Sequence, residues 1–427
     1  MQTIDVFGVS NSDIASYITR NDVDDRFIEG LSRNKHIIVF GASKQGKTAL
    51  TNKHLDESQF IRINCSPDTK PLDIYKSILR QLGVEFEEEK ATTSKIGGAV
   101  SAGFKAKVKI PFITAAEVNG KASGNGSKQE QIKYKPVEYN LALPQDISEI
   151  LKSVNFEKRI ILENFHYLDE ESQKEMAFHL RVFEDYNILF IVLGIWREKN
   201  RLAQFNGDLQ DRLIEVPVEP WKKEYFEEVA KAGEGLLGVS FANVIHGIIE
   251  NSFDSIGVFQ ELCKECCIAA GVENKQQNVK LITPANLEAA KTRKVEDYSG
   301  RHIRSIETFV EQKIKKADEI PLYIAYYFIK YLFSLDAVDI EGGLKRQDIH
   351  SGIQAIHHRP DDVRSSDMSY FLHNMTANQI KKDIIPPLFD YDRSTRKLKV
   401  IDSTLYFFLR NVNTEELFEE FDAPEGI

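Results

Sequence analysis

Eight consecutive residues have the types and the spacing that hold a triphosphate. In such a loop, glycines let backbone N–H groups approach phosphate oxygens, the lysine reaches the β- and γ-phosphates, and the threonine hydroxyl ligates Mg²⁺. The segment matches G-x-x-x-x-G-K-[ST] at every defined position: Gly41-Ala42-Ser43-Lys44-Gln45-Gly46-Lys47-Thr48. These eight residues and Leu50 are therefore predicted to bind a nucleoside triphosphate, with Lys47 at the reacting phosphates.

A second segment could complete this site from another strand. A P-loop ATPase needs an acid at the end of a neighbouring strand to hold Mg²⁺ through water, and usually a second acid to activate the attacking water. Glu163 follows four strand-like residues and is predicted to hold the metal together with Thr48. Asn164 stands where the second acid is expected, and an amide cannot take a proton from water. Either hydrolysis is slow, or another acid such as Asp169 or Glu170 helps.

Three further residues could contact the γ-phosphate. Arg197 and Asn200 come just after an apolar run at 187–194 and could sense the phosphate in the same subunit. Arg212 precedes the next strand, at 214–216, where ring-forming ATPases place the arginine that reaches a neighbour's γ-phosphate. A local ion pair of Arg212 with Asp208 or Asp211 is the competing interpretation.

The elements that must position these residues are parallel strands and helices. Residues 37–40, 60–64, 160–163 and 187–194 are short apolar runs typical of strands that are buried on both faces. Strand, loop and helix follow one another around the P-loop, which is the context that the motif requires. We therefore predict an α/β fold with a parallel sheet.

These motifs together resemble those of AAA+ ATPases of the origin-recognition, archaeal and STAND-like branch. The resemblance also includes a segment at 17–24, similar to the short box that precedes the P-loop there, and covers residues 15–290. It implies ATP as the nucleotide, Mg²⁺, assembly through Arg212, and a lid of three helices at 222–237, 241–251 and 255–270. The family often has a nucleotide-contacting arginine on the third lid helix, but residues 255–262 contain none.

Two features within this region have simple interpretations. Cys263 and Cys266 form one CxxC pair, but a zinc site needs more ligands, so a buried helical pair is expected. Residues 91–136 form an insertion with the most basic stretch of the chain. We expect a protruding hairpin that contacts nucleic acid or an acidic partner, or a solvated insertion. Eight lysines lie in 95–135, at positions 95, 105, 107, 109, 121, 128, 133 and 135, against Glu117 and Glu130.

The last hundred residues are predicted to form a winged helix-turn-helix. An apolar helix begins near 321, a shorter one near Arg346, and a third spans 366–380, followed by a hairpin at 388–401. DNA would contact the third helix and the wing, through His373, Asn374, Asn378, Arg393, Arg396 and Lys397. Many such domains instead bind protein or their own ATPase module, and the acidic C-terminus favours that alternative.

Composition limits the remaining possibilities. The net charge of −10 means that any nucleic-acid contact must come from a local patch. No apolar run approaches the roughly 18 residues of a membrane helix, and the N-terminus does not have the pattern of a secretory signal. The four cysteines in 427 residues fit a reducing cytoplasm rather than a disulfide framework.

The predicted architecture has four parts. They are a P-loop ATPase domain at 1–220 with the insert at 91–136, a helical lid at 221–290, a charged connector at 291–320, and a winged-helix-like domain at 321–427. The predicted function is an ATP-hydrolysing switch or motor that couples nucleotide state to DNA or partner binding. The alternative is a slowly hydrolysing signalling or defence NTPase that assembles through protein contacts without DNA.

Overall fold

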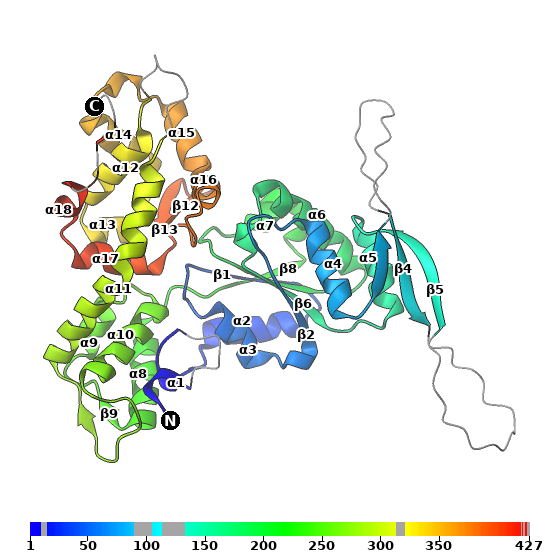
Figure 1. Ribbon diagram of the computed structural model, residues 1–427, viewed down its shortest axis with the longest axis horizontal. Coiled ribbons are helices and arrows are strands. Elements are labelled where there is room, and N and C mark those ends of the chain that lie inside the picture. The colour runs from blue at the N-terminus through cyan, green and yellow to red at the C-terminus, as the bar shows by residue number, and fades with distance from the viewer. Residues whose placement is uncertain are drawn as a thin grey trace, which may run out of the picture.

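The computed structural model (Figure 1) describes the chain except for residues 10–14, 89–104, 113–132, 313–320, 420, 422 and 425–427. At its centre lies a five-stranded sheet with the order β2-β6-β7-β1-β8, and every neighbouring pair is parallel. The predicted parallel α/β fold is confirmed. The strands are β1 (His36–Phe40), β2 (Phe60–Asn64), β6 (Arg159–Glu163), β7 (Phe190–Gly194) and β8 (Leu213–Pro217).

Alternate residues of the central strands supply two separate hydrophobic cores. In β1, Ile38 and Phe40 belong to one core, and Ile37 and Val39 belong to the other. This follows from the twofold period of a strand, which sends successive side chains to opposite faces. Strands buried on both faces are nearly continuous apolar runs, which is why the sequence located them well. Helices on the two faces are α2 (Asn21–Ser32), α3 (Lys47–His54), α4 (Pro71–Gln81), α5 (Pro144–Ser153), α6 (Glu170–Asp185) and the short α7 (Arg201–Phe205).

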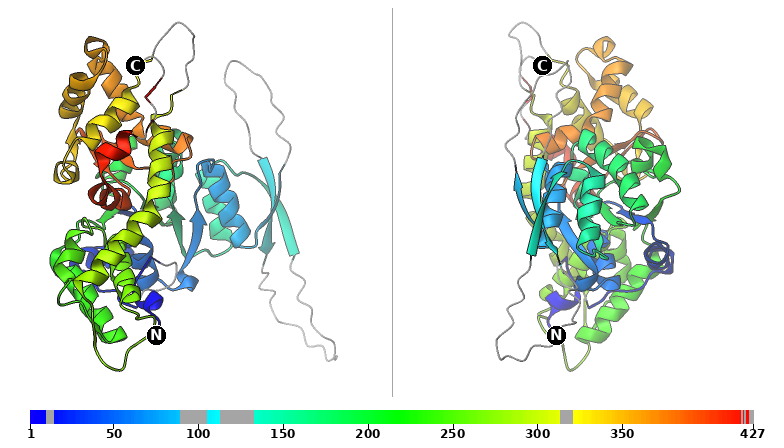
Figure 2. Two further views of the ribbon diagram at one scale, coloured as in Figure 1. Left: turned by 60° about the vertical axis from the view of Figure 1, so that its left-hand side comes forward. Right: turned by 90° about the vertical axis from the view of Figure 1, so that its right-hand side faces the viewer.

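The basic insertion contributes a small antiparallel sheet. It contains β3 (Glu85–Glu88), β4 (Lys105–Phe112) and β5 (Lys133–Asn140), on the side of the ATPase region away from the C-terminal elements (Figures 1 and 2). The register places Lys107 opposite Glu87 on one side and Glu138 on the other. Opposite charges at paired positions attract, so this lysine stands beside two acids. The rest of the predicted insert, 91–104 and 113–132, lies outside the described residues.

The three lid helices occur close to the predicted ranges. They are α8 (Lys223–Leu237), α9 (Ile245–Glu250) and α10 (Ile256–Ala269), joined by the short pair β9 (Val239–Ser240) and β10 (Lys280–Leu281) and by the N-terminal α1 (Thr3–Val6). Cys263, Cys266 and Cys267 are buried in α10, as expected for a structural pair. Within the described residues, no group of three or more histidine, cysteine and acidic side chains is placed to hold a metal ion.

Residues 291–310, most of the predicted charged connector at 291–320, are helical. They belong to α11 (Pro284–Val310), one helix of 27 residues that runs from the lid to the C-terminal elements (Figure 2). Its charged residues lie between buried positions that recur every three or four residues, so the helix has an apolar face. These positions are Leu287, Ala290, Lys294, Tyr298, His302, Ile306 and Phe309.

The C-terminal elements combine short helices with an antiparallel three-stranded sheet, in the order β11-β13-β12. Their hydrophobic core is continuous with that of the lid. The predicted single helix at 366–380 is wrong, because it breaks at Asn374 into two helices. The elements are α12 (Ile324–Phe333), α13 (Ala337–Glu341), β11 (Leu344–Lys345), α14 (Arg346–Ile356), α15 (Ser365–His373), α16 (Met375–Lys381), β12 (Phe389–Asp392), β13 (Lys397–Val400), α17 (Ser403–Asn411) and α18 (Thr414–Glu419).

The lengths and the hydropathy of the helices indicate whether any of them could cross a membrane. None of the helices in the described part of the chain is both long enough and apolar enough to cross a bilayer.

The buried His36 at the start of β1 leads to a pH-dependent stability. Its Nε2 lies 2.9 Å from the Leu180 carbonyl oxygen, and its Nδ1 accepts a hydrogen bond from the Phe190 N–H at 3.0 Å. Burial lowers the pKa of His36 to about 4 from 6.5. The folded state therefore keeps this imidazole neutral while the unfolded chain takes up a proton. The contribution is complete above pH 6.5 and is lost as the pH falls toward 4.

We expect the free energy of unfolding to fall by about 2 kcal/mol between pH 7 and pH 5 on account of this one group. His36→Gln should remove that part of the pH dependence, measured by urea unfolding at both pH values. His246→Gln, at an exposed histidine, is the matched control. Equal pH dependence in the wild type and in His36→Gln would contradict the prediction.

Candidate functional site

The P-loop joins the carboxyl end of β1 to the N-terminus of α3. Gly46 caps this helix with φ +84°, a left-handed conformation that glycine adopts without steric cost. The helix therefore starts with its free N–H groups and its positive dipole end at the loop, an arrangement that attracts anions. The local backbone thus has the form of a phosphate cradle.

Lys47 turns back onto the loop. Its Nζ donates to the carbonyl oxygens of Gly41 at 3.0 Å and of Ala42 at 2.6 Å. Burial lowers the pKa of Lys47 to about 8, although the carboxylates of Glu219 and Glu163 act in the opposite direction. An enclosed ammonium that is bonded to neutral carbonyls is suited to exchange them for phosphate oxygens.

Glu163, the last residue of β6, faces Thr48 across the carboxyl edge of the sheet. The Thr48 hydroxyl donates to Glu163 Oε1 at 3.4 Å, and Arg62 Nη1 also lies 3.4 Å from that oxygen. Burial raises the pKa of Glu163, against the opposing effects of Arg62, Thr48 and Lys47. A hydroxyl and a carboxylate are oxygen ligands of the kind that Mg²⁺ prefers. These two residues therefore fit the predicted metal, directly or through its water shell.

Asp169 and Glu170, the acids that could replace the missing catalytic carboxylate, form ion pairs outside the nucleotide cavity. Asn164 is left-handed, with φ +57°, and begins the short 3₁₀ turn Phe165–Tyr167. Asp169 caps α6 by accepting from the Ser172 N–H at 2.7 Å and pairs with Lys70. Glu170 pairs with Arg393 of the C-terminal hairpin at 3.1 Å. Neither acid lines the cavity next to the P-loop, where Glu163 is the one carboxylate among the described residues.

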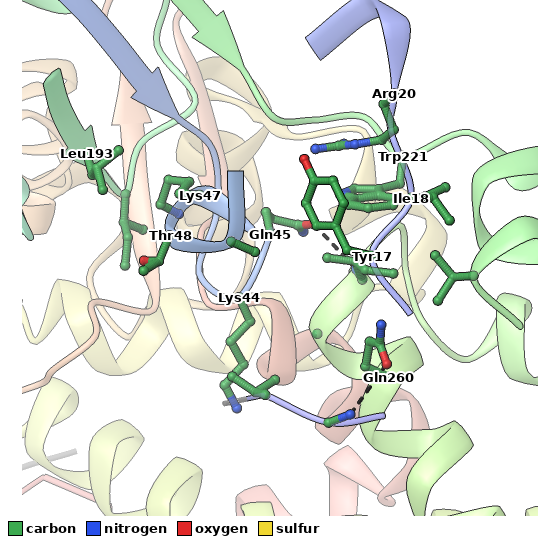
Figure 3. Close-up of a pocket in the computed structure, with 18 of the residues that line it drawn as sticks. Tyr17, Ile18, Arg20, Lys44, Gln45, Lys47, Thr48, Leu193, Trp221 and Gln260 are labelled. Carbon is green, nitrogen blue, oxygen red and sulfur yellow. Dashed lines mark hydrogen bonds between the residues drawn. The ribbon is translucent and has the colours of Figure 1, made fainter. Parts of the chain in front are cut away.

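This cavity has a volume of about 270 Å³ and continues from the P-loop to a wall formed by the N-terminal segment and the lid. Lys47 and Thr48 lie at one end, while Tyr17, Ile18 and Trp221 gather at the other (Figure 3). The Arg20 guanidinium stacks 3.7 Å from the centroid of the Trp221 ring and donates to the Val218 carbonyl at 2.9 Å. The apolar and aromatic end has the character that a flat heterocyclic base requires.

The lid touches the P-loop directly through the start of α10. The Gly257 N–H donates to the Lys44 carbonyl at 3.0 Å, and a Cβ on Gly257 would lie only 2.4 Å from the Lys44 Cβ. Glycine is therefore required there for the close approach. On the same side, Gln260 donates from Nε2 to the Ser16 hydroxyl at 3.0 Å. The cavity is thus closed by three segments that are distant in sequence.

The predicted cofactor residues divide into two groups. Residues 44–48 line the cavity, and their contact with phosphates stays a prediction. Gly41 instead lines a second cavity behind the loop, and Ala42, Ser43 and Leu50 are buried without facing the nucleotide cavity.

The predicted arginine and asparagine sensors lie away from the nucleotide cavity. Arg197 Nε pairs with Glu219 at 2.9 Å behind the P-loop, and the Asn200 N–H donates to Glu215 at 2.7 Å. Arg212 pairs with Glu184, and Asp185 lies nearby. These acids are on α6 and differ from the Asp208 and Asp211 of the sequence-based alternative. The role of Arg212 toward a neighbouring subunit stays a prediction.

Trp221 and Gln260 are among the cavity residues that sequence reasoning missed. Trp221 stands four residues after β8 ends, near the carboxyl edge of the sheet where parallel folds bind ligands. That position was a usable signal. The sequence around Gln260 contained no comparable signal, because the packing of the lid determines which face of α10 lines the cavity.

Comparison with known proteins concerns the ATPase region and the fold. Residues 29–198 match the family model described as "AAA domain". A search of curated protein sequences found no match. A Walker-type ATPase of Pyrococcus abyssi has a similar structure, with a TM-score of 0.52 and 13% identity over 92% of this chain and 96% of that chain. The domain match and this fold likeness agree with the expected AAA-type P-loop ATPase.

Two further solved structures are similar over most of this chain but at lower scores. One is the Aeropyrum pernix ORC1 protein in complex with DNA, with a TM-score of 0.43 and 11% identity over 95% of this chain and 93% of that chain. The other is a STAND protein of Pyrococcus horikoshii, with a TM-score of 0.37 and 11% identity over 94% of this chain and 43% of that chain.

Replacing the P-loop lysine should abolish nucleotide binding. Lys47→Ala removes a charged donor, and hydrogen bonds to charged groups are worth about 1.5–3 kcal/mol each, so we expect ATP affinity to fall at least about 100-fold. Titration calorimetry with ATP and Mg²⁺ checks this, with phosphate release as a second readout. Lys174→Ala, at an exposed lysine on α6, is the control. ATP affinity within threefold of wild type in Lys47→Ala would overturn the assignment.

Proposed function

We propose that this AAA-type ATPase is a switch in which ATP binding at the P-loop rearranges the C-terminal elements. ATP with Mg²⁺ would occupy the cavity, with residues 44–48 around the phosphates and the base near Trp221. Lys47 would hold the reacting phosphates, and Thr48 with Glu163 would hold the metal. Since Asn164 supplies no general base, we expect slow hydrolysis and a long-lived ATP state.

The observation that carries this proposal is a direct contact between the P-loop and the C-terminal elements. The Ser43 N–H donates to the Ile401 carbonyl at 2.9 Å. The Ser403 hydroxyl donates to the Ser43 carbonyl at 2.6 Å, and the Ser403 N–H donates to Ser43 Oγ at 3.2 Å. We call these three bonds the Ser43–Ser403 contact. They join the nucleotide loop to residues 358 and more positions away, without an intermediate element.

Gln45 extends this contact to the lid. Its Nε2 donates to the Ser403 hydroxyl at 3.4 Å, and its Oε1 accepts from the Ile256 N–H of α10 at 3.4 Å. Gln45 is 1% exposed. A movement of the P-loop would therefore change hydrogen bonds to the lid and to α17 together.

The hydrogen bonds of Lys47 suggest how phosphate binding would move the P-loop. A bound phosphate would draw Lys47 from the Gly41 and Ala42 carbonyls to phosphate oxygens. Those two residues immediately precede Ser43, so losing their internal bonds frees the segment that the C-terminal elements hold. ATP binding and the Ser43–Ser403 contact would then be coupled, and reciprocally so.

The C-terminal elements are proposed to act as a winged helix. Helices α12, α14 and α15–α16, with the β12–β13 hairpin as the wing, have the required order. Both Arg393 guanidinium nitrogens contact the Glu170 carboxylate, at 3.1 and 3.3 Å. Arg201 approaches Asp390 at 3.7 Å. The wing arginine is therefore occupied by the ATPase region, and DNA contact through Arg393 would require its release.

Two kinds of partner are compatible with the released state. Arg396 is exposed on the hairpin turn and Asn378 on α16, which favours contact with DNA phosphates once Arg393 is free. Assembly with a protein or a second copy is the alternative, favoured by the net charge of −10 and by the pairing of Lys107 with acids in the insert. Arg212 would then reach a neighbour's nucleotide.

Weakening the Ser43–Ser403 contact should tighten ATP binding. Ser403→Ala removes the hydroxyl's bond to the Ser43 carbonyl and the longer bond from Gln45. Because the contact is proposed to favour the nucleotide-free loop, losing the shorter bond, worth about 0.5–1.5 kcal/mol, should raise ATP affinity about 2- to 10-fold. Calorimetric titration measures this. Ser394→Ala, at an exposed hydroxyl on the hairpin that bonds only locally to Asp392, is the control. Equal affinities in the two variants would remove the coupling from this contact.

Releasing the wing should expose a DNA-binding surface. Glu170→Ala frees Arg393, and we expect it to bind a random-sequence DNA duplex at low salt about threefold more tightly than Glu171→Ala, which changes the net charge equally. Fluorescence anisotropy measures both. Arg393→Ala should lose the gain. If all three variants bind alike, DNA is excluded as the partner of the wing, and ATP-dependent oligomers in mass photometry would support the protein alternative.

A further inference from the structure

His166 is a buried imidazole without a hydrogen-bond partner. It lies in the 3₁₀ turn after β6 and is 2% exposed. Neither ring nitrogen is bonded to any of the described residues. Buried polar groups are nearly always satisfied, because leaving one unpaired costs roughly 1–3 kcal/mol. We therefore expect the His166 ring to form a hydrogen bond with a bound ligand.

His166 occupies a position between two cavities. It lines the nucleotide cavity together with Lys47, Thr48 and Glu163. It also lines a cleft of about 590 Å³ between the ATPase region and the C-terminal elements, where Thr376 of α16 also contributes to the lining. Among the described residues, His166 is the one residue that these two linings share.

Burial and the neighbouring cations favour the neutral form of this imidazole. Burial lowers its pKa well below 6.5, and the cations Lys47 and Arg201 act in the same direction. A neutral imidazole has one N–H donor and one acceptor nitrogen. It can thus donate to a phosphate oxygen and still accept a bond from the cleft side. The Tyr167 ring, with its centroid 4.1 Å from that of His166, holds the imidazole in place.

We propose that His166 reads the terminal phosphate of bound ATP by donating one ring N–H to it, which distinguishes ATP from ADP. This rests on the nucleotide site proposed above. Lys47 reaches both the β- and the γ-phosphate in a P-loop, so it discriminates poorly between the two nucleotides. His166 follows Glu163 after the end of β6, next to the residues that fit the metal. It also lines the cleft to α16, so the same side chain would relate the phosphate to the C-terminal elements.

The test compares affinities for a non-hydrolysable ATP analogue and for ADP, each with Mg²⁺, by calorimetry. His166→Ala and His166→Phe remove the donor, and Phe also keeps the buried volume. Both should lower the ratio of ATP-analogue affinity to ADP affinity about 10-fold, with ADP affinity itself little changed. His166→Gln retains an N–H donor and should recover most of the ratio. Tyr167→Phe is the matched control, because it alters the same turn without touching the nucleotide cavity.

The outcomes separate this proposal from the one on which it rests. An unchanged ratio in both His166→Ala and His166→Phe overturns the proposal and assigns His166 to packing. The proposal also fails if His166→Gln is as impaired as His166→Phe. A Lys47→Ala variant that binds both nucleotides within threefold of wild-type affinity would instead overturn the nucleotide site. Thermal melting of each variant identifies unfolding, and the variants that fold decide between these outcomes.

Discussion

The sharing of one short loop among three parts of the chain is the constraint on which this structure depends. The outer side of the P-loop bonds to the C-terminal elements through Ser43, and its lid side bonds to α10 through Lys44 and Gln45. The inner side is left for phosphates. Because a loop of this kind has few backbone groups, each occupied one limits how the others can move. The lid and the C-terminal elements also share one hydrophobic core, so they are packed together at the loop.

The sequence predicted the sheet and the P-loop well because both are local signals. Buried parallel strands are continuous apolar runs, and the phosphate motif fixes its own flanking elements. The charge pattern at 291–310 did not reveal that α11 continues from the lid, with buried residues such as Tyr298 and Ile306 on one face of a charged helix. The Ser43–Ser403 contact depends on packing between segments that are distant along the chain. No short-range pattern could have predicted it.

The same distinction applies within the site. Lys47, Thr48 and Glu163 could be assigned because each has a motif position, and the structure brings their side chains to one edge of the sheet. Arg197 was expected near the phosphates because it follows a strand, but its guanidinium lies behind the loop and pairs with Glu219. A strand end determines which edge of the sheet a residue occupies, and side-chain direction then depends on the neighbouring charge. Glu219 supplies that charge for Arg197, and it also accepts from the Ala42 N–H at 3.1 Å.

The size of the coupling between nucleotide and C-terminal elements can be bounded from these contacts. Couplings between sites are typically about 1–3 kcal/mol. The Ser43–Ser403 contact contains three hydrogen bonds, each with a net contribution of about 0.5–1.5 kcal/mol, so one or two of them are enough to supply a coupling of that size. Charged hydrogen bonds to a triphosphate are individually stronger than neutral ones. In the proposed switch, phosphate binding would therefore shift this contact, while the contact would be too weak to prevent ATP from binding.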